Sequence, residues 1–191
     1  MCAHISPLAT LLPHTSPASH PALARTLRLF GDPALRFAAK AGIRIVPLRR
    51  SQRYGELSAA LRRLCASVDD WPAPPAGLFV VEERTVYLRS RSAMTVAHEF
   101  GHALDCALGG GVYRSTIDPA VRALYLAARE FVTPYAATSL DEYFAESLRA
   151  YVEANDPASA WPKATRERLQ SIDAGISSYI SRLFEVEFSR S

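Results

Sequence analysis

The segment His98-Glu99-Phe100-Gly101-His102 constrains this chain of 191 residues more than any other feature. It reads H-E-x-x-H, and on an α-helix residues four apart lie on one face, so both imidazoles can bind one metal ion. Glu99 is then placed to act as a general base on water beside that ion. The alternative is a surface helix with two solvated histidines, but no other histidine follows residue 20. The segment therefore predicts a helix that carries a catalytic metal site.

A third protein ligand has to come from elsewhere, because catalytic zinc sites usually take three and leave a fourth position open. The longer pattern H-E-x-x-H-x-x-G-x-x-H is absent, since Asp105 and Leu108 occupy its last two fixed positions. Glu142 and Glu146 lie four residues apart in a segment with helical spacing. One can bind the metal, and the other can accept a hydrogen bond from the far ring nitrogen of a histidine ligand. Asp105 is the rival for either role.

The same carboxylates also have purely structural interpretations. Ser139 and Glu142 fit a capping box, in which Glu142 closes the start of a helix. Glu146 can form an ion pair with Arg149, three residues further on. Residue spacing alone leaves these alternatives open.

Composition argues against several other classes of protein. The net charge is only +3, and no run of basic residues is interleaved with aromatic ones, so no nucleic-acid partner is expected. No stretch approaches 18 apolar residues, which argues against a membrane span. The three cysteines are widely spaced, which predicts neither a disulfide framework nor a cysteine zinc site. The oligomeric state is not predicted.

The length suits one domain with a substantial core. Residues 1–20 are rich in proline, serine and histidine and lack a basic start, so we expect a disordered leader there rather than a Sec signal. Residues 21–191 are expected to form the single domain. Within it, apolar periodicity predicts strands at 43–48, 78–81 and 85–88 and helices at 22–30, 32–42, 55–68, 92–108, 118–132, 140–154 and 164–184. Strands that mostly precede helices predict an α+β fold with a small sheet and a C-terminal helical lobe.

The motif helix, Tyr135 and the segment Asp141-Glu142-Tyr143-Phe144-Ala145-Glu146 together resemble the catalytic domain of the anthrax lethal factor type of zinc metalloendopeptidases. The bacterial Pro-Pro endopeptidases share this pattern. The resemblance implies a zincin-like fold, with a small mixed β-sheet and an active-site helix. The Zn²⁺ ligands that it implies, of the gluzincin type, are His98, His102 and Glu142.

The resemblance also implies roles for the remaining site residues. Glu99 becomes the general base. Tyr135 precedes Glu142 by seven residues, as in the family, and becomes the donor to the oxyanion of the transition state. Glu146 becomes the carboxylate that supports a ligand histidine.

The implied function is hydrolysis of peptide bonds in a protein or peptide substrate. We expect the substrate to lie extended along a sheet edge, with residues 85–88 as the candidate edge strand. The alternatives are a non-peptidase zinc hydrolase, a catalytically inactive zincin-fold binding module and an intracellular regulator peptidase. The family suggests a secreted or delivered protein, and because no Sec signal is seen, a cytoplasmic location is the alternative. The large toxin carries further domains that this sequence lacks, so toxin delivery by its route does not follow.

Overall fold

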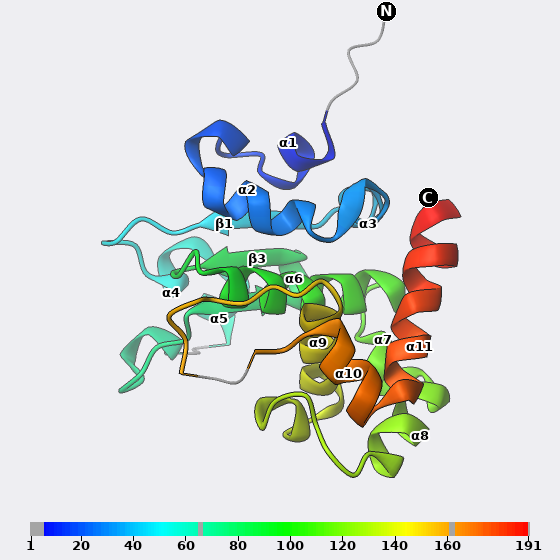
Figure 1. The fold of residues 1–191 in the computed structure, drawn as a ribbon. Helices are drawn as coiled ribbons and strands as arrows, with labels where there is room; N and C mark the ends of the chain where they lie inside the picture. Colours follow the sequence, from blue (N-terminus) through cyan, green and yellow to red (C-terminus); the bar gives the residue numbers. More distant parts are fainter. Residues whose placement is uncertain (1–5, 65–66, 161–162, 191) are drawn as a thin grey trace, which may run out of the picture.

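The computed structural model describes residues 6–64, 67–160 and 163–190 (Figure 1). The α+β fold is confirmed: a three-stranded sheet packs against a larger group of helices. The helices are α1 (Pro7–Leu11), α2 (Pro21–Arg28), α3 (Gly31–Lys40), α4 (Tyr54–Leu57), α5 (Ala59–Arg63), α6 (Ala93–Leu108), α7 (Arg114–Ile117), α8 (Pro119–Ala127), α9 (Leu140–Tyr151), α10 (Arg166–Ile172) and α11 (Ala174–Arg182). None of these helices in the described ranges is long and apolar enough to cross a membrane.

The sheet has the strand order β1-β3-β2. Strand β1 (Arg44–Pro47) runs parallel to β3 (Thr85–Leu88), and β2 (Gly77–Val80) runs antiparallel to β3 on its other side. The expectation that residues 85–88 form an edge strand is therefore wrong, because β3 lies at the centre and pairs on both sides. Strand β2 has a partner on one side only within the described residues, and it contacts the motif helix α6.

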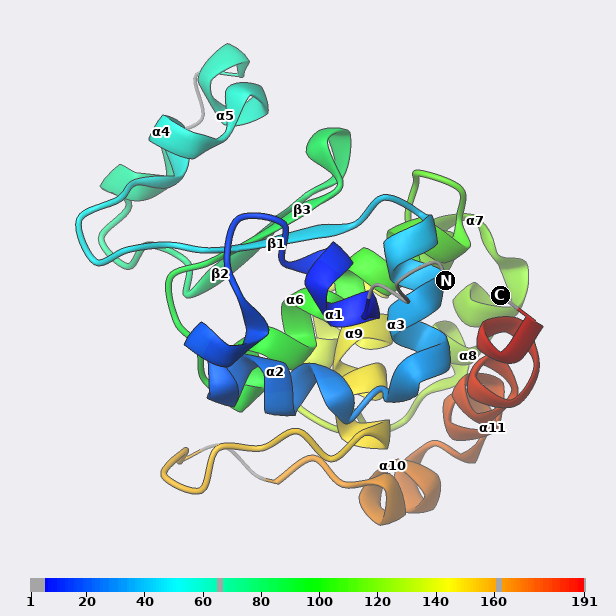
Figure 2. The same cartoon turned by 90° about the horizontal axis from the view of Figure 1, so that it is seen from above.

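Both faces of the sheet are buried. Val86 and Leu88 of β3 belong to the main core, which also contains Phe100 of α6. Tyr87 points the other way and packs with Tyr54 in a smaller core beneath α4 and α5. Figure 2 shows these two short helices projecting from the sheet, away from the other helices. The alternation of side chains along a strand thus supplies two separate cores.

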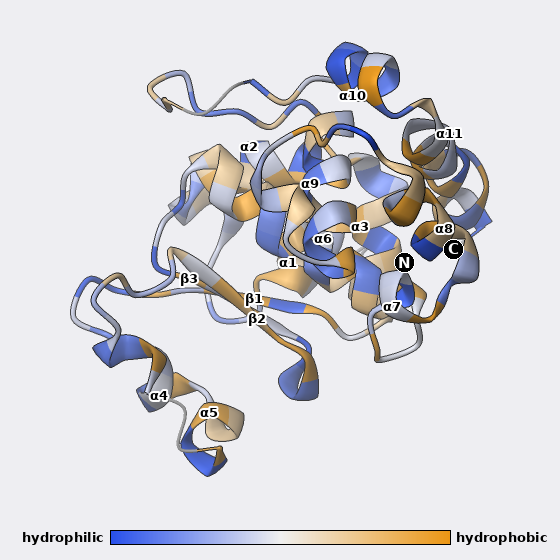
Figure 3. Ribbon diagram, turned by 90° about the horizontal axis from the view of Figure 1, so that it is seen from below, coloured by the Kyte–Doolittle hydropathy of each residue, from blue (hydrophilic) through white to orange (hydrophobic). Residues whose placement is uncertain are grey.

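The helix α6 lies at the centre of the molecule. It packs against α2 and α3 on one side and against α9 on another, and it also contacts β2 and β3. Figure 3 shows α6 and α9 close together, with the sheet to one side. The expected start of α6 is confirmed, since the Ser92 hydroxyl accepts a hydrogen bond from the Thr95 backbone at 3.2 Å.

The N-terminal stretch differs from the disorder expected for residues 1–20. Residues 7–11 form α1, and Leu8, Leu11 and Leu12 are at most 4% exposed within the main core. These three leucines have the i, i+3, i+4 spacing of one helix face, and Pro7 stands in the first turn, where its missing N–H costs no hydrogen bond. The part of the prediction that concerns residues 1–5 lies outside the described residues.

Two predicted helices are divided by polar caps. The helix expected over 55–68 is broken at Ser58, whose hydroxyl accepts from the Leu61 backbone and starts α5. The helix expected over 164–184 is broken at Asp173, whose carboxylate accepts from the Ile176 backbone and starts α11. In both places the side chain offers the backbone an alternative to continuing the helix.

Candidate metal centre

His98 and His102 lie on the same face of α6, as the spacing predicts. Their Nε2 atoms are 3.1 Å apart, and the two rings meet nearly at right angles. His102 is buried and His98 is half-buried at the wall of a cavity. The helical period has therefore brought two metal-binding nitrogens to one point.

Glu142 reaches this point from the first turn of α9. Its Oε2 atom lies 3.1 Å from Nε2 of His98 and 3.4 Å from Nε2 of His102. The start of α9 is capped by the Ser139 hydroxyl, which accepts from the Glu142 backbone at 3.4 Å. The capping interpretation is thus correct for Ser139, while the Glu142 carboxylate turns to the histidines.

These three side chains form a group that can hold a metal ion. Oε2 of Glu142 is buried and has no hydrogen-bond partner of good geometry among the described residues, although two ring nitrogens lie close to it. Burial alone would raise the pKa of Glu142, but the two neighbouring histidine rings favour its charged form and hold the pKa well below its usual range. An unsatisfied buried carboxylate oxygen that faces two imidazole nitrogens is the arrangement a cation would complete.

A glycine lets α6 and α9 approach closely enough to bring the group together. A Cβ atom on Gly101 would lie 3.1 Å from Cα and 3.2 Å from the carbonyl oxygen of Ala145. Gly101, which lies between the two histidines in α6, therefore faces Ala145, which lies between the two glutamates in α9. Gly101 of the H-E-x-x-H segment therefore serves the packing of the two helices and not the chemistry of the site.

Glu99 lies on α6 beneath strand β2. Its side chain is buried, and a Cβ atom on Gly77 would lie only 2.5 Å from its Cγ. Burial raises the pKa of Glu99, and the charges of the nearby His98 and His102 rings partly oppose that effect. Glu99 and His98 both line a cavity of about 420 Å³, which Gly77 at the start of β2 also lines.

Tyr135 lines the same cavity from a short 3₁₀ turn, Tyr135–Ala137. The centre of its ring lies 5.4 Å from that of His98, and the side chain is 45% exposed. Partial burial raises its pKa, and the negative charge of Glu142 raises it further, so the hydroxyl remains a proton donor at neutral pH. The structure thus brings Tyr135 to the cavity from a loop.

Glu146 contacts the second ring nitrogen of His98, Nδ1. Its Oε1 atom lies 2.9 Å from Nδ1 of His98, and its Oε2 accepts a hydrogen bond of 2.6 Å from the Thr133 hydroxyl. Arg149 donates to both oxygens, so the ion pair and the contact with histidine are both present. Burial alone would raise the pKa of Glu146, but hydrogen bonding with His98 and Arg149 lowers it to about 2. Thr133 has no spacing signal, and sequence reasoning missed it.

Asp105 is not brought into the group. It is fully buried, and its carboxylate accepts hydrogen bonds from the Ser115 backbone at 2.8 Å and the Ser115 hydroxyl at 2.6 Å. Burial raises its pKa to about 6. Asp105 therefore anchors the segment that follows α6. That segment also carries Tyr113, whose ring centre lies 5.6 Å from that of His102 and which the sequence did not single out.

No family model matches this chain, and no curated protein matches it. Among solved structures, the chain is similar to the Pro-Pro endopeptidase PPEP-2 from Paenibacillus alvei. The TM-score is 0.65, the similarity covers 93% of this chain and 100% of the other, and the sequences are 18% identical. At that identity the similarity shows a common fold, which agrees with the expected fold class.

Proposed function

We propose that this protein is a zinc-dependent metalloendopeptidase. The observation that carries the proposal is the convergence of His98, His102 and Glu142, with His98 and the buried Glu99 lining one cavity. The three ligand atoms are separated by 3.1 to 3.4 Å. A tetrahedral zinc ion with bonds of about 2.0–2.1 Å requires ligand atoms roughly 3.3 Å apart. Two imidazoles and one carboxylate are also a ligand set found in catalytic zinc sites.

Hydrolysis of a peptide bond follows from the positions of the chain's own groups. A bound zinc ion would supply a Lewis acid that acidifies water and polarises a carbonyl oxygen. Glu99 accepts the proton from the attacking water and passes it to the leaving nitrogen. The Tyr135 hydroxyl donates a hydrogen bond to the oxygen that becomes negative in the transition state. Glu146 holds the ring of His98 in one orientation.

A peptide substrate is expected to lie along the edge of β2. This strand has a free side among the described residues, and Gly77 at its start lines the cavity together with Glu99. An extended peptide adds to such an edge through main-chain hydrogen bonds. The structural neighbour is named as an endopeptidase, which supports a peptide substrate here. The proposal moves the substrate from β3, the strand expected from the sequence, to β2.

The first experiment measures zinc per chain and cleavage of an unstructured protein. We expect about one zinc per wild-type chain, loss of zinc in Glu142→Ala, and retained zinc without cleavage in Glu99→Gln. Asp105→Asn is the matched control, because Asp105 was the rival ligand and should leave the zinc content unchanged. A folded wild-type chain that takes up no zinc when zinc is supplied would overturn the proposal and favour an inactive binding module.

A further inference from the structure

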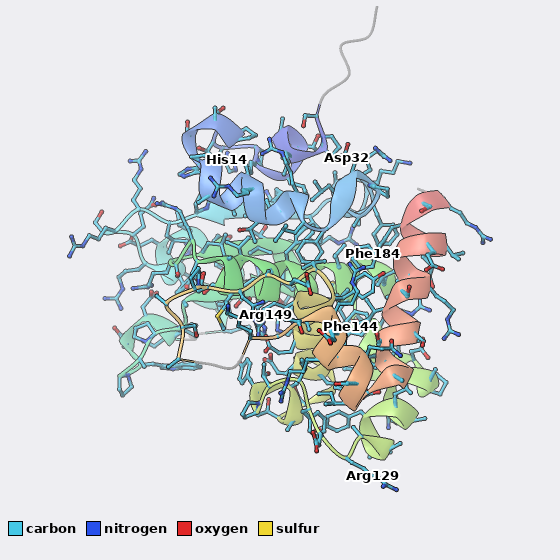
Figure 4. All side chains as sticks on the ribbon, viewed as in Figure 1. His14, Asp32, Arg129, Phe144, Arg149 and Phe184 are labelled. Atoms are coloured by element: carbon cyan, nitrogen blue, oxygen red, sulfur yellow. The ribbon has the colours of Figure 1, made fainter. Side chains whose placement is uncertain are left out.

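Arg149 of α9 is an unusual arginine, because its side chain is only 1% exposed. A buried charge is costly unless it is paired and hydrogen-bonded. Its Nε donates to Oε1 of Glu146 at 2.9 Å, and its Nη2 donates to Oε2 at 2.8 Å. Figure 4 shows Arg149 in the interior of the molecule, whereas Arg129 projects from its surface. The guanidinium therefore fixes both oxygens of one carboxylate in a single plane.

The other end of the guanidinium is fixed as well. Its Nη1 donates to the Ala154 carbonyl at 3.1 Å and to Oδ1 of Asn155 at 3.3 Å. Asn155 in turn accepts from the Ala164 backbone at 3.0 Å and donates to the Ala164 carbonyl at 2.8 Å. Arg149 is thus held between Glu146 and the segment that follows α9. Arg149 also lines the cavity, but each of its three nitrogens already donates within the protein, so the guanidinium is engaged with the protein itself.

We infer that Arg149 is a positioning residue for the metal centre, acting on His98 through Glu146. This inference rests on the proposed function. When Nε2 of His98 binds a metal ion, its Nδ1 carries the proton and donates to Oε1 of Glu146. The metal-bound imidazole is then neutral, so Arg149 is the cation that balances the Glu146 carboxylate in the buried site. Without Arg149, the carboxylate would lose two of its hydrogen bonds and its fixed orientation.

The test measures zinc affinity of the full chain by competition with a chromophoric chelator. We expect Arg149→Met to weaken zinc binding about 10- to 100-fold, the usual effect of losing a group that orients a ligand. Arg149→Lys should restore part of the affinity, because it returns the charge without the two-pronged geometry. Arg114→Met is the matched control, since Arg114 forms its ion pairs with Asp118 and Glu187 and should leave the zinc affinity unchanged.

A double-mutant cycle separates positioning from a general loss of stability. If Arg149 acts through Glu146, then Arg149→Met should weaken zinc binding no further in a Glu146→Gln background. The ¹⁵N chemical shifts of the His98 ring, measured on zinc-loaded protein, should show a proton on Nδ1 in the wild type and a weaker Nδ1–H hydrogen bond in Arg149→Lys. This variant keeps the inference testable if Arg149→Met does not fold.

The outcomes distinguish the two proposals. A wild-type chain that binds no zinc contradicts the proposed function. A wild-type chain that binds zinc, together with folded Arg149 variants of equal affinity and unchanged ¹⁵N shifts of the His98 ring, contradicts the inference alone. Additive effects in the cycle also contradict it, since they would mean that Arg149 does not act through Glu146.

Discussion

At the scale of single residues, Tyr135 offers the most direct test of the chemistry. It contributes a hydroxyl to the cavity and is not one of the three candidate metal ligands. We expect Tyr135→Phe to lower kcat by about 10²–10³, the cost of losing one oxyanion donor, with zinc content unchanged. Tyr151→Phe is the control, because the Tyr151 hydroxyl bonds to Ser181 outside the cavity. Full activity in Tyr135→Phe would show that another group stabilises the transition state.

Asp105 gives a residue-scale prediction for stability against pH. Burial raises its pKa from 3.8 to about 6, so between these values the folded state holds a proton that the unfolded chain releases. The wild type should therefore lose stability relative to Asp105→Asn as the pH rises through that window, by on the order of 3 kcal/mol in total. Urea unfolding of the metal-free proteins from pH 4 to pH 7 measures this difference. Parallel pH profiles for the two proteins would contradict the prediction.

At the scale of secondary-structure elements, the site depends on how closely β2 approaches α6. A Cβ atom on Gly77 would lie 2.5 Å from Cγ of Glu99 and 2.9 Å from Cγ2 of Thr95, so the strand or the Glu99 side chain must move. We expect Gly77→Ala to lower kcat by about 10²-fold, because misplacing a catalytic group by about 1 Å has that effect. Zinc affinity should stay unchanged, since no ligand is displaced.

The neighbouring residue supplies the control for this prediction. Leu78 points to the opposite face of β2 and packs against the small core that contains Tyr54. Leu78→Ala should lower the free energy of unfolding and leave kcat close to the wild-type value. Equal turnover in Gly77→Ala and the wild type would mean that the contact between strand and helix does not position Glu99.

The elements themselves were predictable to different degrees. Helices were expected to begin near residues 92, 118 and 140, and Ser92, Asp118 and Ser139 cap them, because a capping side chain bonds to the backbone only a few residues away. The breaks at Ser58 and Asp173 were missed, since the apolar spacing continues through both positions. The parallel pairing of β1 with β3 was not predicted, because helices and β2 separate these two strands in the sequence and no local pattern specifies how they meet.

At the scale of the whole molecule, α1 joins the N-terminal stretch to the main core. Leu11 is fully buried, whereas its neighbour Thr10 is exposed. We expect Leu11→Ala to lower the free energy of unfolding by about 2–5 kcal/mol, and Thr10→Ala to change it by less than about 0.5 kcal/mol. Urea denaturation of both variants measures the difference. Equal free energies of unfolding in the two variants would contradict this prediction and support the disordered leader expected from composition.

The sequence by itself determined what the helical period controls. Spacings of four residues set His98 beside His102 and Glu142 beside Glu146, because 3.6 residues per turn is a local property. The tertiary structure decided which of these pairs meet, since His98 and Glu146 are 48 residues apart. It also directed Asp105 to Ser115 and placed β2 rather than β3 at the open edge. Contacts between distant segments depend on the packing of whole elements, and no short-range pattern specifies that packing.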